Sequence, residues 1–203
     1  SKADETDLSN NVVLRANNIN LATYKLDFED LKYIKDSVAI RDDKKLKLND
    51  ILICTASGSK SHLGKVALIE EDLNMAFGGF MGVLRTKSSS INPEYLFKLL
   101  SSSLFGKHVQ GLSDGANINN LKFSQIQDFH IPLPPLATQQ KIVAKLDAIF
   151  AEIDKAIAAT EANVKNAEAL FQSYLTEVFE RGGDDWTVAT LKEITTKIGS
   201  GAT

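Results

Sequence analysis

The chain has 203 residues, of which 43% are hydrophobic and 24% charged, a composition typical of a soluble globular protein. Its net charge of −3 argues against a uniformly basic nucleic-acid binder. The charge balance differs along the chain, with 16 Lys/Arg and 16 Asp/Glu in residues 1–135 but 7 and 10 in residues 136–203. No apolar run approaches the about 20 residues that span a bilayer, so a membrane protein is not expected. The N-terminal segment has no signal- or transit-peptide pattern, and the single cysteine, Cys54, excludes an intrachain disulfide. A cytoplasmic location is expected.

Residues 1–135 are expected to form an α/β (α+β) domain. Short apolar runs bounded by Asn, Asp, Ser or Gly predict strands, and they lie at 12–19, 50–56, 65–71 and 81–86. Polar, glycine-containing loops are expected over 57–64 and 111–121, and a helical turn followed by a short strand over 121–131. Few segments alternate cleanly between polar and apolar residues, so the strand order is not predicted.

One clear helix is predicted over residues 92–103. Asn92 suits the cap, Pro93 suits the first helical position, and Glu94 suits the positive end of the helix dipole. The following apolar residues have helical spacing.

A much longer helix is predicted over residues 136–182. The Pro-rich segment 131–135 forces an extended entry, and no further proline or glycine occurs until Gly182. We expect the helix to begin at Leu136 or Thr138 and to end near Arg181. At about 1.5 Å per residue it is on the order of 65 Å long, so much of it is expected to extend past a domain of this size.

This helix carries an apolar seam on which a second helix can pack. Spacings of four and three residues are typical of a coiled coil. The large seam residues are Ile142, Leu146, Ile149, Ile153, Leu170 and Tyr174. The centre of the seam is weaker, with Ala156, Thr160 and Asn163. The alternative is a long helix that packs only on its own domain.

Residues 183–203 have the character of a domain's opening segment. Five large apolar residues need a core in which to be buried, which is not typical of a solvated tail. They are Trp186, Val188, Leu191, Ile194 and Ile198.

The junction IPLPPLATQQKIVAKLDAIFAEID resembles the segment of type I restriction-modification specificity subunits where a target-recognition domain passes into a long spacer helix. Family members show an apolar-Pro-Leu-Pro-Pro motif, a Gln-rich turn, an Ile-Val pair and a Leu-Asp pair. Here these are residues 131–136, Gln139 and Gln140, Ile142 and Val143, and Leu146 and Asp147. Upstream, NDILICTASGS, LGKVALI and INPEYLFKLLSS are similar to the recognition-domain scaffold, in the same order.

One departure from the family pattern concerns the order of the segments. Recognition domains of the family open with a Trp-containing strand, a helix and a Gly-containing turn, whereas here the similar piece, WTVATLKEITTKIGSG, begins at Trp186. We therefore expect the chain to begin inside a recognition domain. It is similar to a natural half subunit, a circular permutant or an excised fragment of a longer or fused enzyme, and these remain open. Also open is whether residues 186–203 pack in their own chain or complete the domain of a partner.

No catalytic motif is present in the sequence. The only Pro-Pro lacks the flanking residues of an adenine-methylation motif, and SGSKS over 57–61 lacks the spacing of a phosphate-binding loop. His62, His108 and His130 have no metal-ligand spacing, so no metal site is expected. The resemblance implies a non-catalytic subunit whose methylation and restriction partners bind S-adenosylmethionine, ATP and Mg²⁺.

Four groups of residues carry side chains suited to DNA, namely Arg and Lys for phosphates and Asn, Ser or His for base edges. The candidates are Arg15 and Asn17; Ser57, Ser59, Lys60 and His62; Asn117, Asn119 and Lys122; and Arg85. Each also fits a plainer interpretation, such as a strand connector for the second group or an Asx-rich turn for the third.

The resemblance implies sequence-specific binding of double-stranded DNA together with the methylation and restriction subunits. We expect a homodimer held by an antiparallel helix pair, which would place two recognition domains at a fixed separation on a bipartite target. The alternative is a coiled-coil scaffold whose globular head binds protein.

Overall fold

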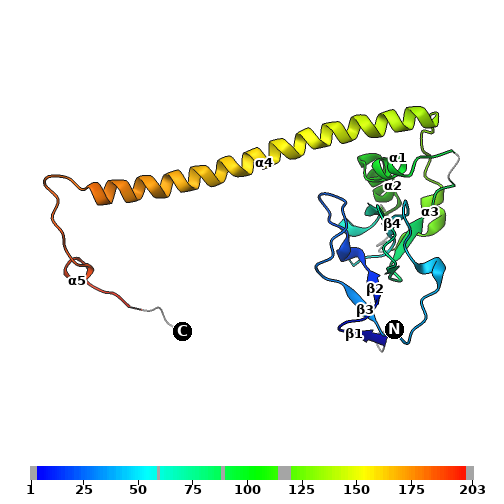
Figure 1. The fold of residues 1–203 in the computed structure, drawn as a ribbon, viewed down its shortest axis with the longest axis horizontal. Helices are drawn as coiled ribbons and strands as arrows, with labels where there is room; N and C mark the ends of the chain where they lie inside the picture. The colour runs from blue at the N-terminus through cyan, green and yellow to red at the C-terminus, as the bar shows by residue number, and fades with distance from the viewer. Residues whose placement is uncertain (1–3, 59, 88–89, 114–119, 200–203) are drawn as a thin grey trace. The chain divides into compact units, whose positions relative to one another are not determined.

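A computed structural model describes residues 4–58, 60–87, 90–113 and 120–199. The chain divides into two units, Ser1–Ala148 and Ile149–Thr203. Figure 1 shows the strands and the short helices α1, α2 and α3 in the first unit, and the long helix α4 that continues from the first unit into the second. The predicted fold class, a mixed α/β domain followed by a long helix, is confirmed.

The first sheet has the strand order β1-β3-β2-β6. Its strands are β1 (Glu5–Thr6), β3 (Lys32–Ile34), β2 (Asn11–Leu14) and β6 (Ala76–Phe77). β3 pairs antiparallel with β1 and β2, whereas β2 and β6 run parallel, with Val13 opposite Ala76. The β2 and β6 strands therefore end at the same edge of the sheet.

The second sheet is antiparallel and has the order β5-β4-β7. Its strands are β5 (Val66–Leu68), β4 (Ile51–Cys54) and β7 (Met81–Leu84). All four residues of β4 are buried, and alternate residues face two different cores. Leu52 and Cys54 join a core with Leu14, whereas Ile51 and Ile53 join a core with Phe105 of α2. Burial on both faces explains the uninterrupted apolar run in the sequence.

The predicted strand at 12–19 is only half right. β2 ends at Leu14, and Ala16–Asn18 form a turn of 3-10 helix. The buried side chain of Asn18 causes this change of direction: its oxygen accepts from the backbone N–H of Arg15 at 2.9 Å, and its amide donates to the Asp27 and Asp30 carbonyls. An Asn side chain that satisfies three backbone groups fixes a turn where residue type alone suggested a strand.

The helical region after β7 consists of α1 (Pro93–Leu100), α2 (Ser103–Ser113) and α3 (Phe123–Gln127). The Asn92 cap is confirmed, because its side chain accepts from Tyr95 N–H at 2.9 Å. The helix predicted over 92–103 instead ends at Leu100, and α2 continues into the segment predicted as a loop from residue 111. Phe105 and Val109 of α2 are buried, so packing on the core extends the helix. No strand occurs at 128–131 among the described residues.

Helix α4 (Leu136–Arg181) has the predicted bounds. In the first unit its opening turns pack on the domain through buried Gln139 and Val143. Lys98 of α1 also forms an ion pair with Asp147 at 2.6 Å. The start of α4 is therefore part of the domain.

The second unit buries little apolar surface. It contains the rest of α4 and the short helix α5 (Leu191–Ile194). Trp186 contacts the ring of Phe179 at 6.2 Å but remains half exposed, and Val188 is fully exposed. None of the large apolar side chains described between residues 184 and 199 is buried in this structure.

Candidate nucleic-acid interface

Most of the described DNA-contact candidates lie at one end of the two sheets. β2 and β6 end there, β4 ends there, and β7 begins there because it runs antiparallel to β4. The connections between these strands are held together by backbone hydrogen bonds. Gly78 N–H donates to the Leu14 carbonyl, and the Thr55 and Ala56 N–H groups donate to the Phe80 carbonyl. We call this end of the sheets the strand-end surface.

The second and third candidate groups meet on this surface. Ala56 forms a β-bridge with Asn120, and the Leu121 N–H donates to the Thr55 carbonyl at 2.6 Å. Ser57 follows this bridge on one strand and Lys122 follows it on the other. Lys122 is exposed, and no hydrogen bond or ion pair of its ammonium is recorded within the described part of the chain. No sequence pattern indicated that these two loops are neighbours.

Four of the candidates cannot be placed as side chains. Ser59, Asn117 and Asn119 lie outside the described residues, and only the backbone of Lys60 is described, in the 3-10 turn Lys60–His62. Their role in DNA contact stays a prediction.

Arg15 and Asn17 lie next to the same surface. Asn17 is exposed, and the Arg15 side chain is 3.8 Å from the position that a Cβ on Gly78 would occupy. The Arg15 guanidinium donates to the Asp30 carboxylate at 2.8 Å. This ion pair is partly exposed, so a DNA phosphate can compete with Asp30 at modest cost.

Arg85 lies at the opposite end of the second sheet. It follows the last residue of β7, and its guanidinium forms two hydrogen bonds with Asp50, which precedes β4, at 2.7 and 2.6 Å. Asp50 is 1% exposed. The structure therefore separates Arg85 from the other candidates and gives its charge a structural partner.

Two aromatic residues on the strand-end surface were missed by the sequence interpretation. Phe80 is 72% exposed in the turn before β7, and Phe123 is 59% exposed at the start of α3. Phe123 lies over Gly82 of β7, where a Cβ would approach its ring to 2.8 Å. Exposed aromatic rings beside polar loops can contact thymine methyl groups or bases. The sequence signal was the pair Gly78 and Gly79 immediately before Phe80.

The histidine of the second loop is uncharged at neutral pH. Burial, and then the neighbouring Lys65, lower the pKa of His62 below its ordinary value. A neutral imidazole has one donor and one acceptor nitrogen, so it can bond to a base edge without adding charge.

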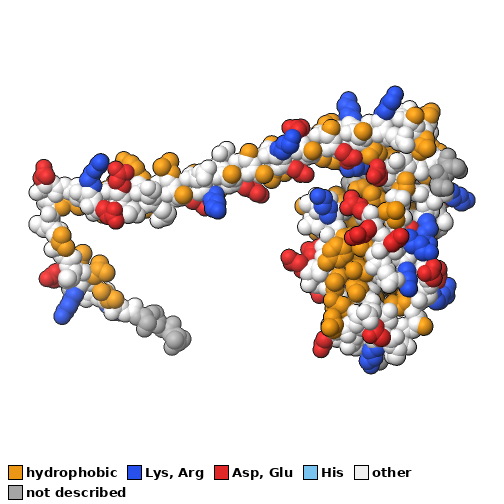
Figure 2. Space-filling view, viewed as in Figure 1, with side chains coloured by type: hydrophobic (Ala, Val, Ile, Leu, Met, Phe, Trp, Pro, Cys, Tyr) orange, Lys and Arg blue, Asp and Glu red, His pale blue; other side chains and the backbone are white. Residues whose placement is uncertain are grey.

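The predicted seam of α4 is only partly covered by the domain. Leu146 is half-buried, whereas the other large seam residues are exposed. A second apolar run, one residue further along the helix, was missed: Val143, Phe150, Ile157, Val164 and Phe171 recur every seven residues. With Leu146, Ile153, Thr160, Ala167, Tyr174 and Val178 they give an uninterrupted spacing of three and four. Figure 2 shows hydrophobic side chains spread along the visible face of α4.

No helix among the described residues combines the length and the apolar character needed to cross a membrane. Likewise, this part of the chain contains no group of three or more His, Cys, Asp or Glu side chains arranged to hold a metal ion.

Comparison with known proteins gives a consistent family. Residues 2–162 match the family described as type I restriction modification DNA specificity domain. The chain is 37% identical over 149 residues to the StySPI specificity subunit of Salmonella potsdam and 38% identical over 149 residues to the EcoKI specificity subunit of Escherichia coli. Each match covers 73% of this chain and 31% of the relative, so the chain spans about a third of the length of these proteins.

Solved structures share the fold at lower identity. The HsdS subunit of Thermoanaerobacter tengcongensis superposes with a TM-score of 0.66 at 23% identity, covering 86% of this chain and 46% of that one. A chain from a structure on the complex assembly and conformational transition of the type I R-M system gives a TM-score of 0.69 at 23% identity, covering 91% and 48%.

Proposed function

The chain belongs to the family of type I restriction modification DNA specificity domains, and we propose that it reads one half of a bipartite DNA target for a type I restriction-modification enzyme. The single observation that carries this proposal is the family match over residues 2–162, which spans the recognition-like domain and the start of α4. In this role the chain is non-catalytic and docks the methylation and restriction subunits.

The strand-end surface supports the proposal as the DNA-contacting face. It gathers Lys122 and Arg15 for phosphates, and Asn17, Ser57 and His62 for base edges, from loops far apart in the sequence. Convergence of loops on a rigid strand framework is how side chains are held against a groove. Phe80 and Phe123 add apolar contact at the same place.

Helix α4 supports pairing with a second copy of the chain. Its exposed apolar residues continue over the second unit, where no other element covers them in the described structure. An antiparallel pair of identical helices has twofold symmetry, so a homodimer would read a palindromic, split target.

The exposed residues Trp186 to Ile198 support a further step. An apolar set of this size in one segment is unstable in water unless something covers it. We propose that this segment packs on the recognition domain of the partner chain and supplies its opening strand and helix.

The DNA-binding part is tested by electrophoretic shift of the full chain on duplex DNA with salt titration. Affinity is expected to fall steeply with salt because phosphate contacts release counterions. Phe80→Ala is expected to weaken binding about tenfold, in line with the loss of an aromatic contact to a base. Leu8→Ala is the matched control, since Leu8 is 78% exposed but precedes β2 at the opposite end of the sheet.

The docking part is tested by co-expression with the methylation subunit, followed by mapping of methylated adenines. Co-purification and methylation at one split, palindromic sequence are expected. If no complex forms and duplex DNA is not bound, the proposed function is wrong and a protein-binding head on a coiled coil takes its place.

A further inference from the structure

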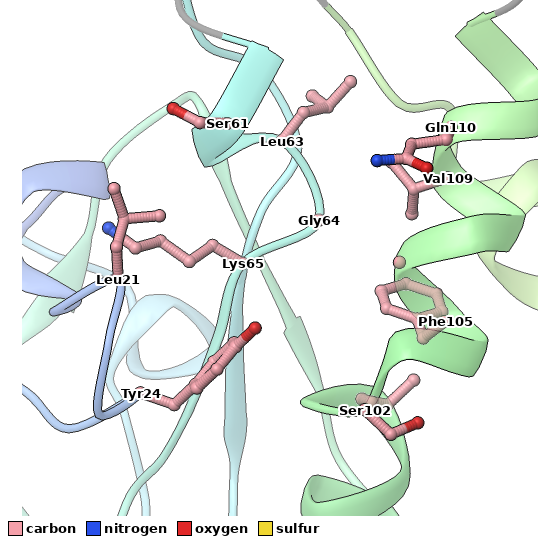
Figure 3. Close-up of a pocket in the computed structure, with 12 residues that line it drawn as sticks. Leu21, Tyr24, Ser61, Leu63, Gly64, Lys65, Ser102, Phe105, Val109 and Gln110 are labelled. Carbon is pink, nitrogen blue, oxygen red and sulfur yellow. The ribbon is translucent and has the colours of Figure 1, made fainter.

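A cavity of about 180 Å³ lies in the recognition domain between the β4–β5 connection, the turn at 21–24 and helix α2. Figure 3 shows Lys65 and Tyr24 on one side of it, and Phe105 and Val109 of α2 on the other. The β4–β5 connection also carries Ser57 and His62 of the strand-end surface. The cavity is thus next to the surface proposed to meet DNA, but none of the predicted contact residues whose side chains are described lines it.

Among the described residues that line this cavity, Lys65 is the only cation, and it is 5% exposed. Within the described part of the chain its ammonium has neither a hydrogen bond nor an ion pair. Burial lowers the pKa of Lys65. The electrostatic interaction with Cys54 raises this pKa and so offsets part of the decrease. Burial raises the pKa of Cys54 above its ordinary value, so the thiol is neutral at neutral pH and supplies no counter-charge.

One further polar group of the cavity, the Tyr24 hydroxyl, is available to a ligand. The Tyr24 hydroxyl has no recorded hydrogen bond among the described residues, although its ring packs against the core. On the opposite wall, Ser102, Gly106 and Gln110 recur every four residues and so share one face of the α2 region. The middle residue is a glycine, and a Cβ there would meet no atom within 4 Å. A side chain at this position would therefore face open space.

We propose that this cavity binds a phosphate group, with the Lys65 ammonium as its counter-charge and the Tyr24 hydroxyl as a hydrogen-bond donor. The Lys65 side chain is largely removed from water and its ammonium has no counter-charge among the described residues, so an anion that enters the cavity stabilises it. The phosphate belongs either to the DNA backbone or to a small phosphate compound. The first alternative rests on the proposed function. Both sources have the same chemistry at Lys65.

The first experiment uses the full chain and inorganic phosphate, with chloride at equal ionic strength as the reference. Phosphate is expected to raise the melting temperature and to shift the Lys65 Cε–H signals in an NMR titration. Lys65→Met removes the charge at nearly constant shape, and its phosphate affinity is expected to fall at least about tenfold, the loss that accompanies removal of one charge-assisted bond. Gly106→Met fills the cavity from the opposite wall and is expected to have the same effect.

The matched control is Lys107→Met. Lys107 lies beside Gly106 on α2, is exposed and does not line the cavity. It makes the same change in net charge, so its phosphate affinity is expected to equal that of the unchanged chain. If Lys65→Met and Lys107→Met lower the phosphate affinity equally, the effect comes from general surface charge and the proposal is overturned.

The second experiment identifies the source of the phosphate. If it is the DNA backbone, Lys65→Met lowers the salt dependence of duplex binding by about one phosphate contact, and Lys107→Met does not. Phosphate binding with an unchanged salt dependence supports the site and assigns it to a small phosphate compound. Absence of both effects in Lys65→Met and Gly106→Met overturns the site. A chain that binds phosphate through Lys65 but never binds duplex DNA contradicts the proposed function alone.

Discussion

The buried residue Asp50 determines the role of Arg85, which the sequence suggested as a DNA contact. Its carboxylate accepts two hydrogen bonds from Arg85 and one from the Lys47 N–H at 2.8 Å. The ion pair raises the pKa of Arg85 further above its ordinary value. Asp50 is removed from water, so the carboxylate needs this cation more than the half-exposed guanidinium needs the carboxylate.

Removing the cation is expected to leave Asp50 as a buried, uncompensated charge. Arg85→Ala should lower the free energy of unfolding by about 2–3 kcal/mol, less than for a fully buried pair because Arg85 is partly solvated. Urea denaturation measures this. The matched control is Arg41→Ala, whose partner Asp43 is exposed; it should change stability by about 0.5 kcal/mol or less. Similar losses in the two variants would argue against a structural role for the Asp50–Arg85 pair.

At the scale of elements, Gln139 joins the long helix to the domain. Its side-chain oxygen accepts from the Asn92 N–H at 2.8 Å, and its amide nitrogen donates to the Ser90 and Pro134 carbonyls at 3.1 and 2.8 Å. One fully buried side chain thereby connects the start of α4, the Pro-rich entry and the start of α1. Tyr95 adds to this junction, because its hydroxyl donates to the Pro132 carbonyl.

Gln139→Leu is expected to lower the free energy of unfolding by about 2–4 kcal/mol, since it leaves a buried N–H and carbonyl groups without partners. Gln140→Leu provides the matched control, because Gln140 is the exposed neighbour on the same turn and should change stability by less than about 0.5 kcal/mol. Thermal and urea unfolding compare the two. If Gln139→Leu leaves the free energy of unfolding unchanged, water or a shifted backbone replaces these hydrogen bonds.

The apolar runs on α4 place the expected helix pair in one of two registers. The predicted seam has Asn163 at its centre, whereas the second run has Val164 there and larger apolar residues throughout. The second run also continues the face on which Val143 is buried against the domain. We therefore propose that the partner helix centres on the second run.

Substitution by aspartate at the two central positions distinguishes these registers. Val164→Asp is expected to raise the dimer dissociation constant at least about a hundredfold, because it buries a charge in the seam. Asn163→Asp adds the same charge one residue away and is expected to have a small effect. Light scattering across a range of concentrations gives both constants, and the opposite ranking would support the seam first predicted.

At the scale of the whole molecule, the two units differ in how they bury apolar side chains. Residues of the first unit form two cores on either side of β4. In the second unit the described apolar residues remain exposed. The first unit can thus fold on its own contacts, whereas the second is expected to become ordered mainly by contact with another chain.

Val188 is fully exposed in the single chain. A photo-cross-linking amino acid at this position tests whether the second unit contacts another chain. In a mixture of isotopically heavy and light chains, cross-links are expected between residue 188 of one chain and the recognition domain of the other. The same amino acid at Ala169, on the face of α4 away from both apolar runs, should give few such products. Cross-links only within one chain would show that the Trp186 segment packs in its own domain.

The sequence by itself determined the local features. Proline at 132, 134 and 135 and the absence of proline and glycine until Gly182 set both ends of α4, because backbone dihedrals depend on residue type. The Asn92 cap and the core of β4 were predictable for the same local reason.

Only the tertiary structure decided the features that depend on distant partners. The strands β1, β3 and β6 are two or three residues long and exist through pairing with remote segments, so no local pattern marks them. Contacts between distant segments also produce three features of the candidate sites. These are the β-bridge between Ala56 and Asn120, the ion pair between Arg85 and Asp50, and the burial of Lys65 beside a cavity. The sequence specifies the type of each side chain, but the packing of the whole domain determines its partners and its access to water.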